Sequence, residues 1–266
     1  MDLLNKVAIV TGASRGIGAG VVDKFAMHGA KVVIADISLG ETEGFADKLK
    51  KNGHEVYASQ TDVTKIESVE SMVADTIERF KTIDILVNNA GVWAAPGFVD
   101  RALSEPEDWD ITYEVNLKAV ASVTNAVVPY MKNNSYGKII NIASVGGKIG
   151  SASNPAYMAS KAGTISLTKS SALEYAKFNI NVNAICPGFV WTPMAISIEE
   201  QAGSNQPEYT NMAPREIYDS LVAETIPLGR DQTPEDIGNL AVFLASEFSK
   251  NITGQAINVC GGSNMD

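Results

Sequence analysis

Cysteine and histidine are scarce in this chain, which has two residues of each type among 266. The two thiols, Cys186 and Cys260, are too few for a disulfide framework and suit a reduced compartment, so we expect both to be buried thiols. His28 and His54 have no cysteine or histidine beside them at metal-ligand spacing. A metal site is therefore not predicted.

Long apolar runs and clusters of positive charge are also lacking. No segment approaches the ~18 unbroken apolar residues of a membrane span. The formal net charge is −10 without a basic cluster, which disfavours binding to nucleic acid or to an anionic membrane. Residues 1–6 lead directly into an apolar run and leave no room for a signal peptide. We expect a cytoplasmic protein whose partners are small molecules.

Seven short apolar runs rich in β-branched residues recur along the chain, with amphipathic segments between them. The runs are almost continuously hydrophobic, which is typical of strands covered on both faces of a parallel sheet. They lie at 6–12, 30–36, 55–63, 84–91, 137–144, 180–188 and 255–262. Without a long linker or a repeat, this alternation predicts an α/β fold: one doubly wound Rossmann-type domain over 1–266, with helices on both faces of a seven-stranded parallel sheet.

One stretch breaks the alternation of strand and helix. Residues 192–221 follow the sixth predicted strand and mix glycine, proline and asparagine with amphipathic fragments. We interpret this segment as a mobile lid over a substrate.

A glycine-rich turn connects the first predicted strand to the first helix. Gly12, Gly16 and Gly18 allow a tight turn and a close approach of the backbone to a pyrophosphate at a helix N-terminus. The alternative is a glycine turn without a ligand, but a strand before the turn and a helix after it favour a dinucleotide.

The end of the second predicted strand carries Asp36, which bears on the choice of dinucleotide. A carboxylate here can accept hydrogen bonds from the adenosine ribose and repel a 2′-phosphate, which favours NAD over NADP. Arg15 argues the other way, because a guanidinium beside the glycine turn could pair with that phosphate. We give Asp36 the greater weight and predict NAD.

Polar residues gather where other predicted strands end. Ser144 ends the fifth strand, the pair Asn88 and Asn89 ends the fourth, and Tyr157 and Lys161 follow one helical turn apart. Because ligands bind beyond the carboxyl ends of parallel strands, these groups and the glycine turn are expected at one edge of the sheet. Tyr157 and Lys161 can then meet Ser144 beside a bound nicotinamide.

The motifs in their order resemble those of the short-chain dehydrogenases/reductases over essentially the whole chain. They are Gly12-x-x-x-Gly16-x-Gly18, Asn88-Asn89-Ala90-Gly91, Asn116, Ser144, Tyr157-x-x-x-Lys161 and Pro187-Gly188. The resemblance implies hydride transfer between carbon and a nicotinamide, with Tyr157 as the acid or base. A free phenol, with a pKa near ~10, needs Lys161 and the positive nicotinamide ring to lower that pKa. Ser144 would bind the substrate oxygen, and Asn116 would support a water that leads protons away from Lys161.

The resemblance also implies further contacts. Residues expected to bind the cofactor, besides the glycines, Arg15, Asp36, Tyr157 and Lys161, are Ser14, Ile17, Asp62, Val63, Asn89, Ala90, Gly91, Pro187, Gly188, Val190 and Thr192. Candidate pocket residues for the substrate are Trp93, Val145, Gly146, Asn154, Phe189 and Met194, with Trp191 undecided between pocket and packing. Cys260 stands where many members have an acid. Members usually associate through long helices beside the active site, so a homotetramer is expected.

These features predict an NAD-dependent oxidoreductase for a secondary alcohol or ketone of the diol, polyol, cyclic alcohol or hydroxysteroid class. Two other hypotheses stay open. One is an NADPH-dependent ketone reductase, such as one for 3-oxoacyl carrier-protein thioesters. The other is a non-catalytic nucleotide-sensing protein on the same fold.

Overall fold

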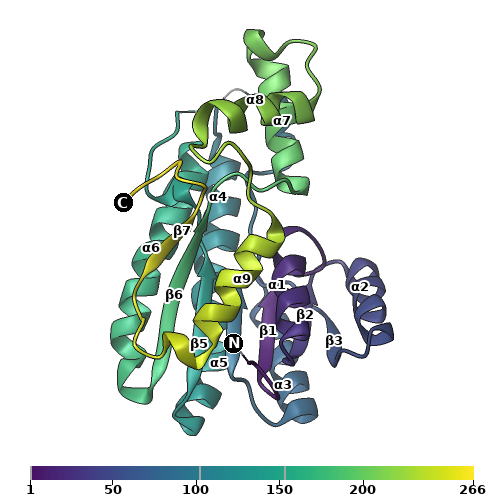
Figure 1. Cartoon of the computed structure of the whole chain (residues 1–266), viewed down its shortest axis with the longest axis vertical. Helices are drawn as coiled ribbons and strands as arrows, with labels where there is room; N and C mark the ends of the chain where they lie inside the picture. Colours follow the sequence, from purple (N-terminus) through teal and green to yellow (C-terminus); the bar gives the residue numbers. More distant parts are fainter. Residues whose placement is uncertain (1, 102, 153) are drawn as a thin grey trace.

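Seven parallel strands form one sheet in the computed structural model, which describes residues 2–101, 103–152 and 154–266 (Figure 1). The order across the sheet is β3-β2-β1-β4-β5-β6-β7. The strands are β1 (Val7–Thr11), β2 (Lys31–Asp36), β3 (Val56–Gln60), β4 (Ile85–Asn88), β5 (Gly137–Ile142), β6 (Ile180–Pro187) and β7 (Ala256–Val259). All seven predicted strands and their parallel arrangement are confirmed.

Helices cover both faces of the sheet. One hydrophobic core joins the sheet to α1 (Gly16–Met27), α2 (Leu39–Lys51) and α9 (Pro234–Ala245). A second core joins the opposite face to α3 (Ile66–Phe80), α5 (Ala119–Asn134) and α6 (Pro155–Tyr175). The doubly wound Rossmann-type architecture is therefore the one that the sequence predicts.

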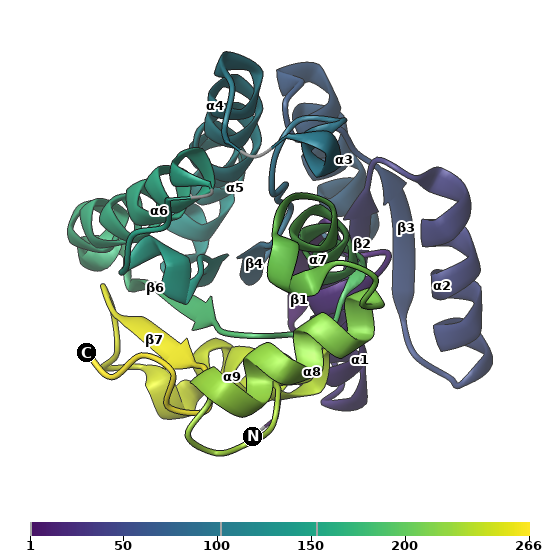
Figure 2. The same ribbon diagram turned by 90° about the horizontal axis from the view of Figure 1, so that it is seen from above.

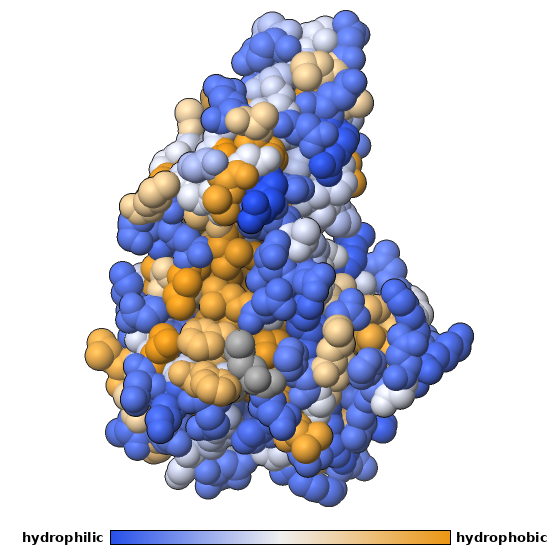
Figure 3. Space-filling model, in the orientation of Figure 1, coloured by the Kyte–Doolittle hydropathy of each residue, from blue (hydrophilic) through white to orange (hydrophobic). Residues whose placement is uncertain are grey.

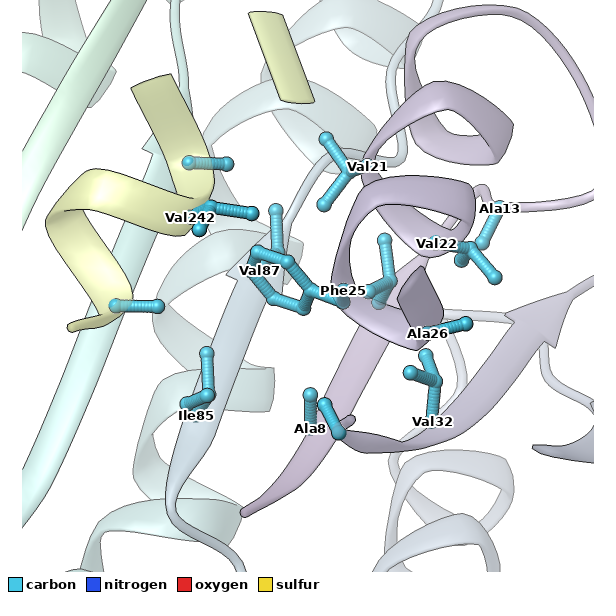
Figure 4. Packing of buried hydrophobic residues seen from close by; sticks show 14 of the residues in the cluster. Ala8, Ala13, Val21, Val22, Phe25, Ala26, Val32, Ile85, Val87 and Val242 are labelled. Carbon is cyan, nitrogen blue, oxygen red and sulfur yellow. The ribbon is translucent and has the colours of Figure 1, made fainter. Parts of the chain in front are cut away.

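Alternate side chains of the central strands enter different cores. In β1, Ala8 and Val10 belong to the core under α1 and α9, whereas Ile9 belongs to the core under α5. This period of two explains why the strand sequences are continuously apolar, since both faces are buried. In Figure 4, Phe25 of α1 points toward Val87 of β4, and Val242 of α9 lies beside them.

Two glycines let α1 and α9 touch along their backbones. A Cβ added at Gly20 would lie 2.5 Å from the carbonyl oxygen of Pro234, and one at Gly238 would lie 2.7 Å from the carbonyl oxygen of Gly20. Real Cβ atoms do not tolerate such distances, so both positions require glycine. The first helix of the chain is thereby packed directly on the ninth.

The strand order reverses between β1 and β4, and that point marks the expected ligand site of a doubly wound sheet. Two further helices, α7 (Pro193–Asn205) and α8 (Pro214–Thr225), project beyond the carboxyl ends of the strands and lie across this end in the view from above (Figure 2). The predicted lid, 192–221, thus contains α7 and most of α8. In the described residues, no helix is both long and apolar enough to cross a membrane.

Candidate active site

The glycine turn fits a pyrophosphate. Gly12 and Gly16 have φ of 60° and 57°, in the left-handed region that favours glycine. A Cβ at Gly12 would lie 2.7 Å from the Cα of Ala90, and a Cβ at Gly18 would lie 2.4 Å from the carbonyl oxygen of Gly12. The turn is therefore packed so closely that side chains at these two positions would displace backbone.

The N-terminus of α1 is open to an anion. Its N-cap, Arg15, makes no capping hydrogen bond with its side chain, and the first turn carries no acidic residue. By contrast, Thr233 caps α9 and Thr192 caps α7 with their hydroxyl groups. The unpaired N–H groups of α1 and the helix dipole can then bind a phosphate. Together with the glycines, this arrangement fits a dinucleotide.

Asp36 is held in place at the end of β2. Its Oδ2 accepts hydrogen bonds from the backbone N–H of Ser14 at 3.0 Å and from the Ser14 hydroxyl at 2.9 Å. Its Oδ1 accepts one from the backbone N–H of Ser38 at 3.1 Å. The carboxylate and Ser14 thus lie together beside the glycine turn, as the cofactor prediction requires.

Residues Asn89 and Ala90 connect β4 to the glycine turn. The Asn89 side-chain amide donates to the carbonyl oxygens of Thr11 and Gly12 at 2.9 and 2.7 Å. The Thr11 hydroxyl accepts from the backbone N–H groups of Asn89 and Ala90 at 3.0 and 3.1 Å. The Asn89 amide therefore braces the turn through these bonds, and the predicted contact of Asn89 with the cofactor stays a prediction.

The remaining predicted cofactor residues lie around this turn. Ile17 packs on the core under α1, and the Asp62 carboxylate accepts two hydrogen bonds from Thr64. The backbone N–H of Gly188, just after Pro187 ends β6, donates to the Val259 carbonyl at 2.9 Å, and Val190 pairs with Gln232. Thr192 lies near the turn, since a Cβ at Gly16 would lie 3.5 Å from its methyl group. Val63 and Ala90 lie close to Thr11 and Asn88 in closely packed surroundings.

Tyr157 and Ser144 form the centre of the candidate catalytic group. Ser144 follows β5, and its Oγ accepts a hydrogen bond from the backbone N–H of Gly146 at 3.0 Å. Tyr157 lies in the first turn of α6 and is 8% exposed. Burial raises the pKa of the Tyr157 phenol to about 12, and a hydrogen bond with the Ser144 hydroxyl partly opposes that rise. In the chain alone, the phenol is neutral at physiological pH.

Lys161 lies one turn further along α6, with its Nζ 5.7 Å from the centre of the Tyr157 ring. The ammonium donates to the carbonyl oxygen of Ile142 at 2.8 Å and is 4% exposed. Burial lowers the pKa of Lys161 to about 8. In the chain alone, burial raises the Tyr157 pKa more than the Lys161 ammonium can lower it. The lowered phenol pKa that the sequence predicts therefore depends on the positive charge of the cofactor ring.

Asn116 sits in a π-helical turn (Glu114–Lys118) between α4 (Pro106–Tyr113) and α5. Its side chain accepts from the Val92 backbone N–H at 2.8 Å and donates to the Val92 carbonyl at 2.9 Å and to the Ser160 hydroxyl at 3.0 Å. The Thr164 hydroxyl donates to the Asn116 carbonyl at 2.8 Å. Asn116 therefore ties the loop that follows β4 to α6.

Trp93 packs against the catalytic candidate. Its ring lies 4.6 Å from the Tyr157 ring, centre to centre, and 6.4 Å from the Phe98 ring. Asn154 fixes this arrangement: its amide donates to the Trp93 carbonyl at 2.8 Å, and its Oδ1 accepts from the Tyr157 backbone N–H at 3.1 Å. Asn154 is 0% exposed. Asn154 thus caps α6 and joins it to Trp93, and the predicted place of Trp93 in a substrate pocket stays a prediction.

The loop over Tyr157 depends on a residue that sequence reasoning did not select. Asp108 is 0% exposed and accepts hydrogen bonds from the backbone N–H groups of Ala95 and Glu105, both at 2.8 Å, and from the Arg101 guanidinium at 2.6 Å. The available signal was Pro106 followed by an acid at the third helical position, a pattern typical of a helix start. Its long-range partners, Ala95 and Arg101, leave no such signal.

The lid segment is built around an aromatic cluster. Phe189 and Trp191 pack on Tyr218 of α8, at 5.9 and 4.8 Å between ring centres. The α7 helix is joined to the loop over the site by Gln201 and Asn205, whose amides donate to the carbonyl oxygens of Arg101 and Val99 at 2.8 and 2.9 Å. Of the other pocket candidates, Gly146 is buried beside Ser144, Val145 packs partly into a small core, and Met194 is half-buried on α7.

Glu199 is an unusual member of the lid. It lies on the same face of α7 as Ala195 and Gly203, and this face packs on α8. The Glu199 side chain is 4% exposed. Its Oε2 has no hydrogen-bond partner among the described residues. Burial raises the pKa of the Glu199 carboxyl to about 7. The described residues contain no cluster of three or more histidine, cysteine, aspartate or glutamate side chains suited to a metal ion.

Known proteins of several kinds match this chain along its length. A family model described as enoyl-(acyl carrier protein) reductase matches residues 12–264. Oxidoreductase UcpA of Salmonella typhimurium is 44% identical over 264 residues, which cover 99% of this chain and 96% of that protein. The 3-oxoacyl-[acyl-carrier-protein] reductase FabG of Thermotoga maritima is 38% identical over 262 residues, 98% and 99% of the two chains.

Solved structures agree with these matches. Levodione reductase superposes with a TM-score of 0.88 at 29% identity, covering 97% of each chain. A variant of actinorhodin polyketide ketoreductase, solved with NADPH, superposes with a TM-score of 0.88 at 34% identity and the same coverage. The long matches, the strand order and the grouping of Ser144, Tyr157 and Lys161 point to one family. This protein belongs to the short-chain dehydrogenases/reductases and is an oxidoreductase of that family.

Proposed function

We propose that the protein is an NAD-dependent oxidoreductase that interconverts a secondary alcohol and a ketone. The observation that carries the proposal is the buried Tyr157 phenol, with the Ser144 hydroxyl beside it and Lys161 one turn away. These groups follow β5 at the strand ends where the glycine turn also lies. The substrates we propose are diols, polyols, cyclic alcohols or hydroxysteroids, because the Trp93 ring packs on Tyr157 and the Phe98 ring packs on Trp93, so aromatic groups lie beside the phenol.

The cofactor proposal depends on Asp36 and the glycine turn. The open N-terminus of α1 would bind the pyrophosphate, and Asp36 would accept hydrogen bonds from the adenosine ribose. Lys161 would reach the nicotinamide ribose, and Thr192 the carboxamide. When bound, NAD supplies the acceptor for the hydride and a positive charge.

The protein groups then have separate roles. Tyr157 holds the proton that moves to or from the substrate oxygen, and its burial keeps the phenol protonated in the chain alone. Ser144 donates a hydrogen bond to that oxygen and stabilises the charge that develops there. Lys161 favours the tyrosinate form by its positive charge. Asn116 supports the water through which Lys161 exchanges protons with solvent.

An NADPH-dependent ketone reductase is the second candidate function. The similarity to FabG and to a ketoreductase solved with NADPH favours it, and Arg15 offers a cation at the glycine turn. We place it second because Asp36 would lie against a 2′-phosphate. A nucleotide-sensing protein comes third, since Ser144, Tyr157 and Lys161 are all present and grouped.

We further propose a cytoplasmic homotetramer. Trp109 and Tyr113 on α4 and Leu173 on α6 are exposed apolar side chains on helices beside the site. On the face shown in Figure 3, hydrophobic residues also gather over β7, the strand at the edge of the sheet. Exposed apolar patches and open strand edges are typical of subunit contacts. Light scattering of the purified protein tests this, and a monomeric mass would contradict it.

The test of the proposed function follows the absorbance of reduced nicotinamide with NAD and NADP. Each cofactor is offered with a panel of diols, polyols, cyclic alcohols and hydroxysteroids, and each reduced cofactor with the corresponding ketones and a 3-oxoacyl thioester. We expect turnover with NAD and a loss of at least about 10²-fold in Tyr157→Phe, because the proton donor is removed. Calorimetry should show that this variant still binds NAD.

The outcomes separate the candidate functions. Turnover restricted to NADPH and 3-oxoacyl thioesters would favour the second candidate. Near-full turnover in Tyr157→Phe would remove the role given to the phenol. Binding of NAD without turnover of any substrate would favour the nucleotide-sensing protein.

A further inference from the structure

A second carboxylate lies beside Asp36 in the structure. Glu41, in the first turn of α2, places its Oε2 3.3 Å from the Ser14 hydroxyl oxygen. The same hydroxyl donates to Asp36 at 2.9 Å. Two negative side chains therefore converge on one hydroxyl group at the end of β2.

Glu41 also faces the nearest cation of the glycine turn. Its Oε1 lies 3.8 Å from an Nη1 nitrogen of Arg15. Arg15 is the N-cap of α1 and carries the one argument from sequence for NADP. With Glu41 beside it, the guanidinium already has a negative partner on the protein.

We propose that Glu41 is a specificity-determining residue that makes the site reject a 2′-phosphorylated dinucleotide. It does so in two ways: it engages Arg15, and it adds a negative charge next to Asp36. The inference rests on the proposed function, because it concerns which dinucleotide that site binds. Unlike Asp36, which ends β2, Glu41 belongs to the following helix, α2.

The exposure of Arg15 and Glu41 to solvent sets how strongly the site can discriminate against a 2′-phosphate. The side chains of Arg15 and Glu41 are 65% and 51% exposed, so the ion pair contributes little to folding. A 2′-phosphate carries up to about two negative charges, and it would meet both carboxylates while Arg15 is already paired with Glu41. Screening limits this repulsion, so the discrimination should weaken as salt rises.

The test measures dissociation constants for NAD and NADP by calorimetry, which needs no turnover. In Glu41→Gln we expect NADP to bind about 10-fold more tightly, because Arg15 is released and one negative charge is lost. NAD binding should change less than about 2-fold. The matched control is Glu43→Gln, which removes the same charge from an exposed residue of α2. Glu43 lies two positions after Glu41, so the two side chains are on different faces of the helix.

A double-mutant cycle tests the part played by Arg15. Arg15→Ala should change NADP binding little in the wild-type chain, where Glu41 engages the guanidinium. In the Glu41→Gln background, Arg15→Ala should remove most of the gained affinity. A gain in Glu41→Gln that shrinks at high salt, and that is absent in Glu43→Gln, would support the proposal.

Other results would overturn it. An unchanged ratio of the two dissociation constants in Glu41→Gln, with NAD still bound, would overturn this inference and leave the proposed function intact. Equal gains in Glu41→Gln and Glu43→Gln would show a general charge effect and overturn it as well. A chain that binds neither dinucleotide would overturn both the inference and the proposed function.

Discussion

The glycine turn and the lid lie at the same end of the sheet, but they differ in how far their polar side chains are hydrogen-bonded. Around the turn, Asp36, Ser14 and Asn89 all use their side chains in hydrogen bonds to neighbouring segments. In the lid, Glu199 is buried with an unpaired oxygen, and the helices pack through Phe189, Trp191 and Tyr218. One region is fixed by directional bonds and the other by apolar contact.

This difference indicates which part of the site can move. A network of satisfied hydrogen bonds specifies one geometry, so the cofactor side is preorganised. The α7 helix is joined to the loop over Tyr157 by two bonds, from Gln201 and Asn205, beside its apolar packing. Opening of the predicted lid would cost few polar contacts, and local opening of this kind is typical of substrate-binding segments.

The substitution expected to disrupt dinucleotide binding most is Gly18→Ala. The added Cβ would lie 2.4 Å from the Gly12 carbonyl oxygen and 2.5 Å from the Asn89 amide nitrogen, and both belong to the rigid turn. We expect dinucleotide binding to weaken by at least about 10²-fold, or folding to be lost, because overpacking displaces backbone. Calorimetry and thermal unfolding measure the two effects.

The matched control adds the same methyl group to the lid. In Gly203→Ala, the new Cβ would lie 3.3 Å from the terminal carbon of the flexible Ile217 side chain. Helix propensity favours alanine by about 0.5–1 kcal/mol, which offsets the crowding. Nearly unchanged stability and NAD binding are expected; a loss as large as that of Gly18→Ala would contradict the contrast between the two regions.

Asp108→Asn should weaken substrate binding without changing the binding of NAD. The substitution leaves Arg101 without its buried charge partner, and breaking such a pair costs about 3 kcal/mol or more. Because Asp108 fixes the loop that carries Trp93, we expect KM for the substrate to rise while the dissociation constant of NAD stays unchanged. Denaturant unfolding gives the stability loss. The exposed Asp110 offers a control, Asp110→Asn, and a weaker binding of NAD in Asp108→Asn would show that the two sides are coupled.

Glu199→Gln gives a smaller effect that depends on pH. The folded-state pKa of Glu199 is raised from 4.5 to about 7, so the folded protein holds the proton more tightly than the unfolded chain does. The free energy of unfolding therefore falls as pH rises from about 4.5 through about 7. Wild type should lose up to about 3 kcal/mol over this range through Glu199, and Glu199→Gln should not.

Thermal unfolding near pH 5 and near pH 8 measures this prediction. The variant should gain stability over wild type at the higher pH, and the gain should shrink at the lower pH. Glu200→Gln, at the next and exposed position of α7, serves as the control. Parallel pH curves for wild type and Glu199→Gln would contradict a buried carboxyl that titrates in the lid.

The fold could be predicted from the sequence because its signals are local. Each strand is a short run of residues such as Val7 to Thr11, buried on both faces, and each glycine of the turn stands at a fixed separation from the others. The lid over 192–221 stays a prediction, and the structure shows that α8 continues to Thr225, four residues beyond that range. The helix stops two residues before Pro227, which cannot continue it, and Ile226 packs into the same cluster as Val222.

The site was predictable in part. That Ser144, Tyr157 and Lys161 lie together could be predicted, because Ser144 follows a strand end and the other two share one helix face, whereas their catalytic roles stay a prediction. Asp108 and Glu41 were missed because their partners are distant in sequence: Ala95 lies on another loop, and Ser14 lies 27 residues before Glu41. Asn154 was expected to line the pocket, but its role as a bridge between Trp93 and Tyr157 depends on two segments 61 residues apart.

The contact between Gly20 and Gly238 has a consequence for synthesis of the chain. The helix α1 is translated long before α9, but the surface that covers Phe25 and Val21 is supplied by α9, which ends at Ala245. At about 5–20 residues per second, α1 waits roughly 10–40 s for that partner. Until then the nascent chain exposes an apolar helix on the ribosome, where chaperones that bind such surfaces would act. Completion of the dinucleotide-binding half is therefore tied to a helix that is translated much later than α1.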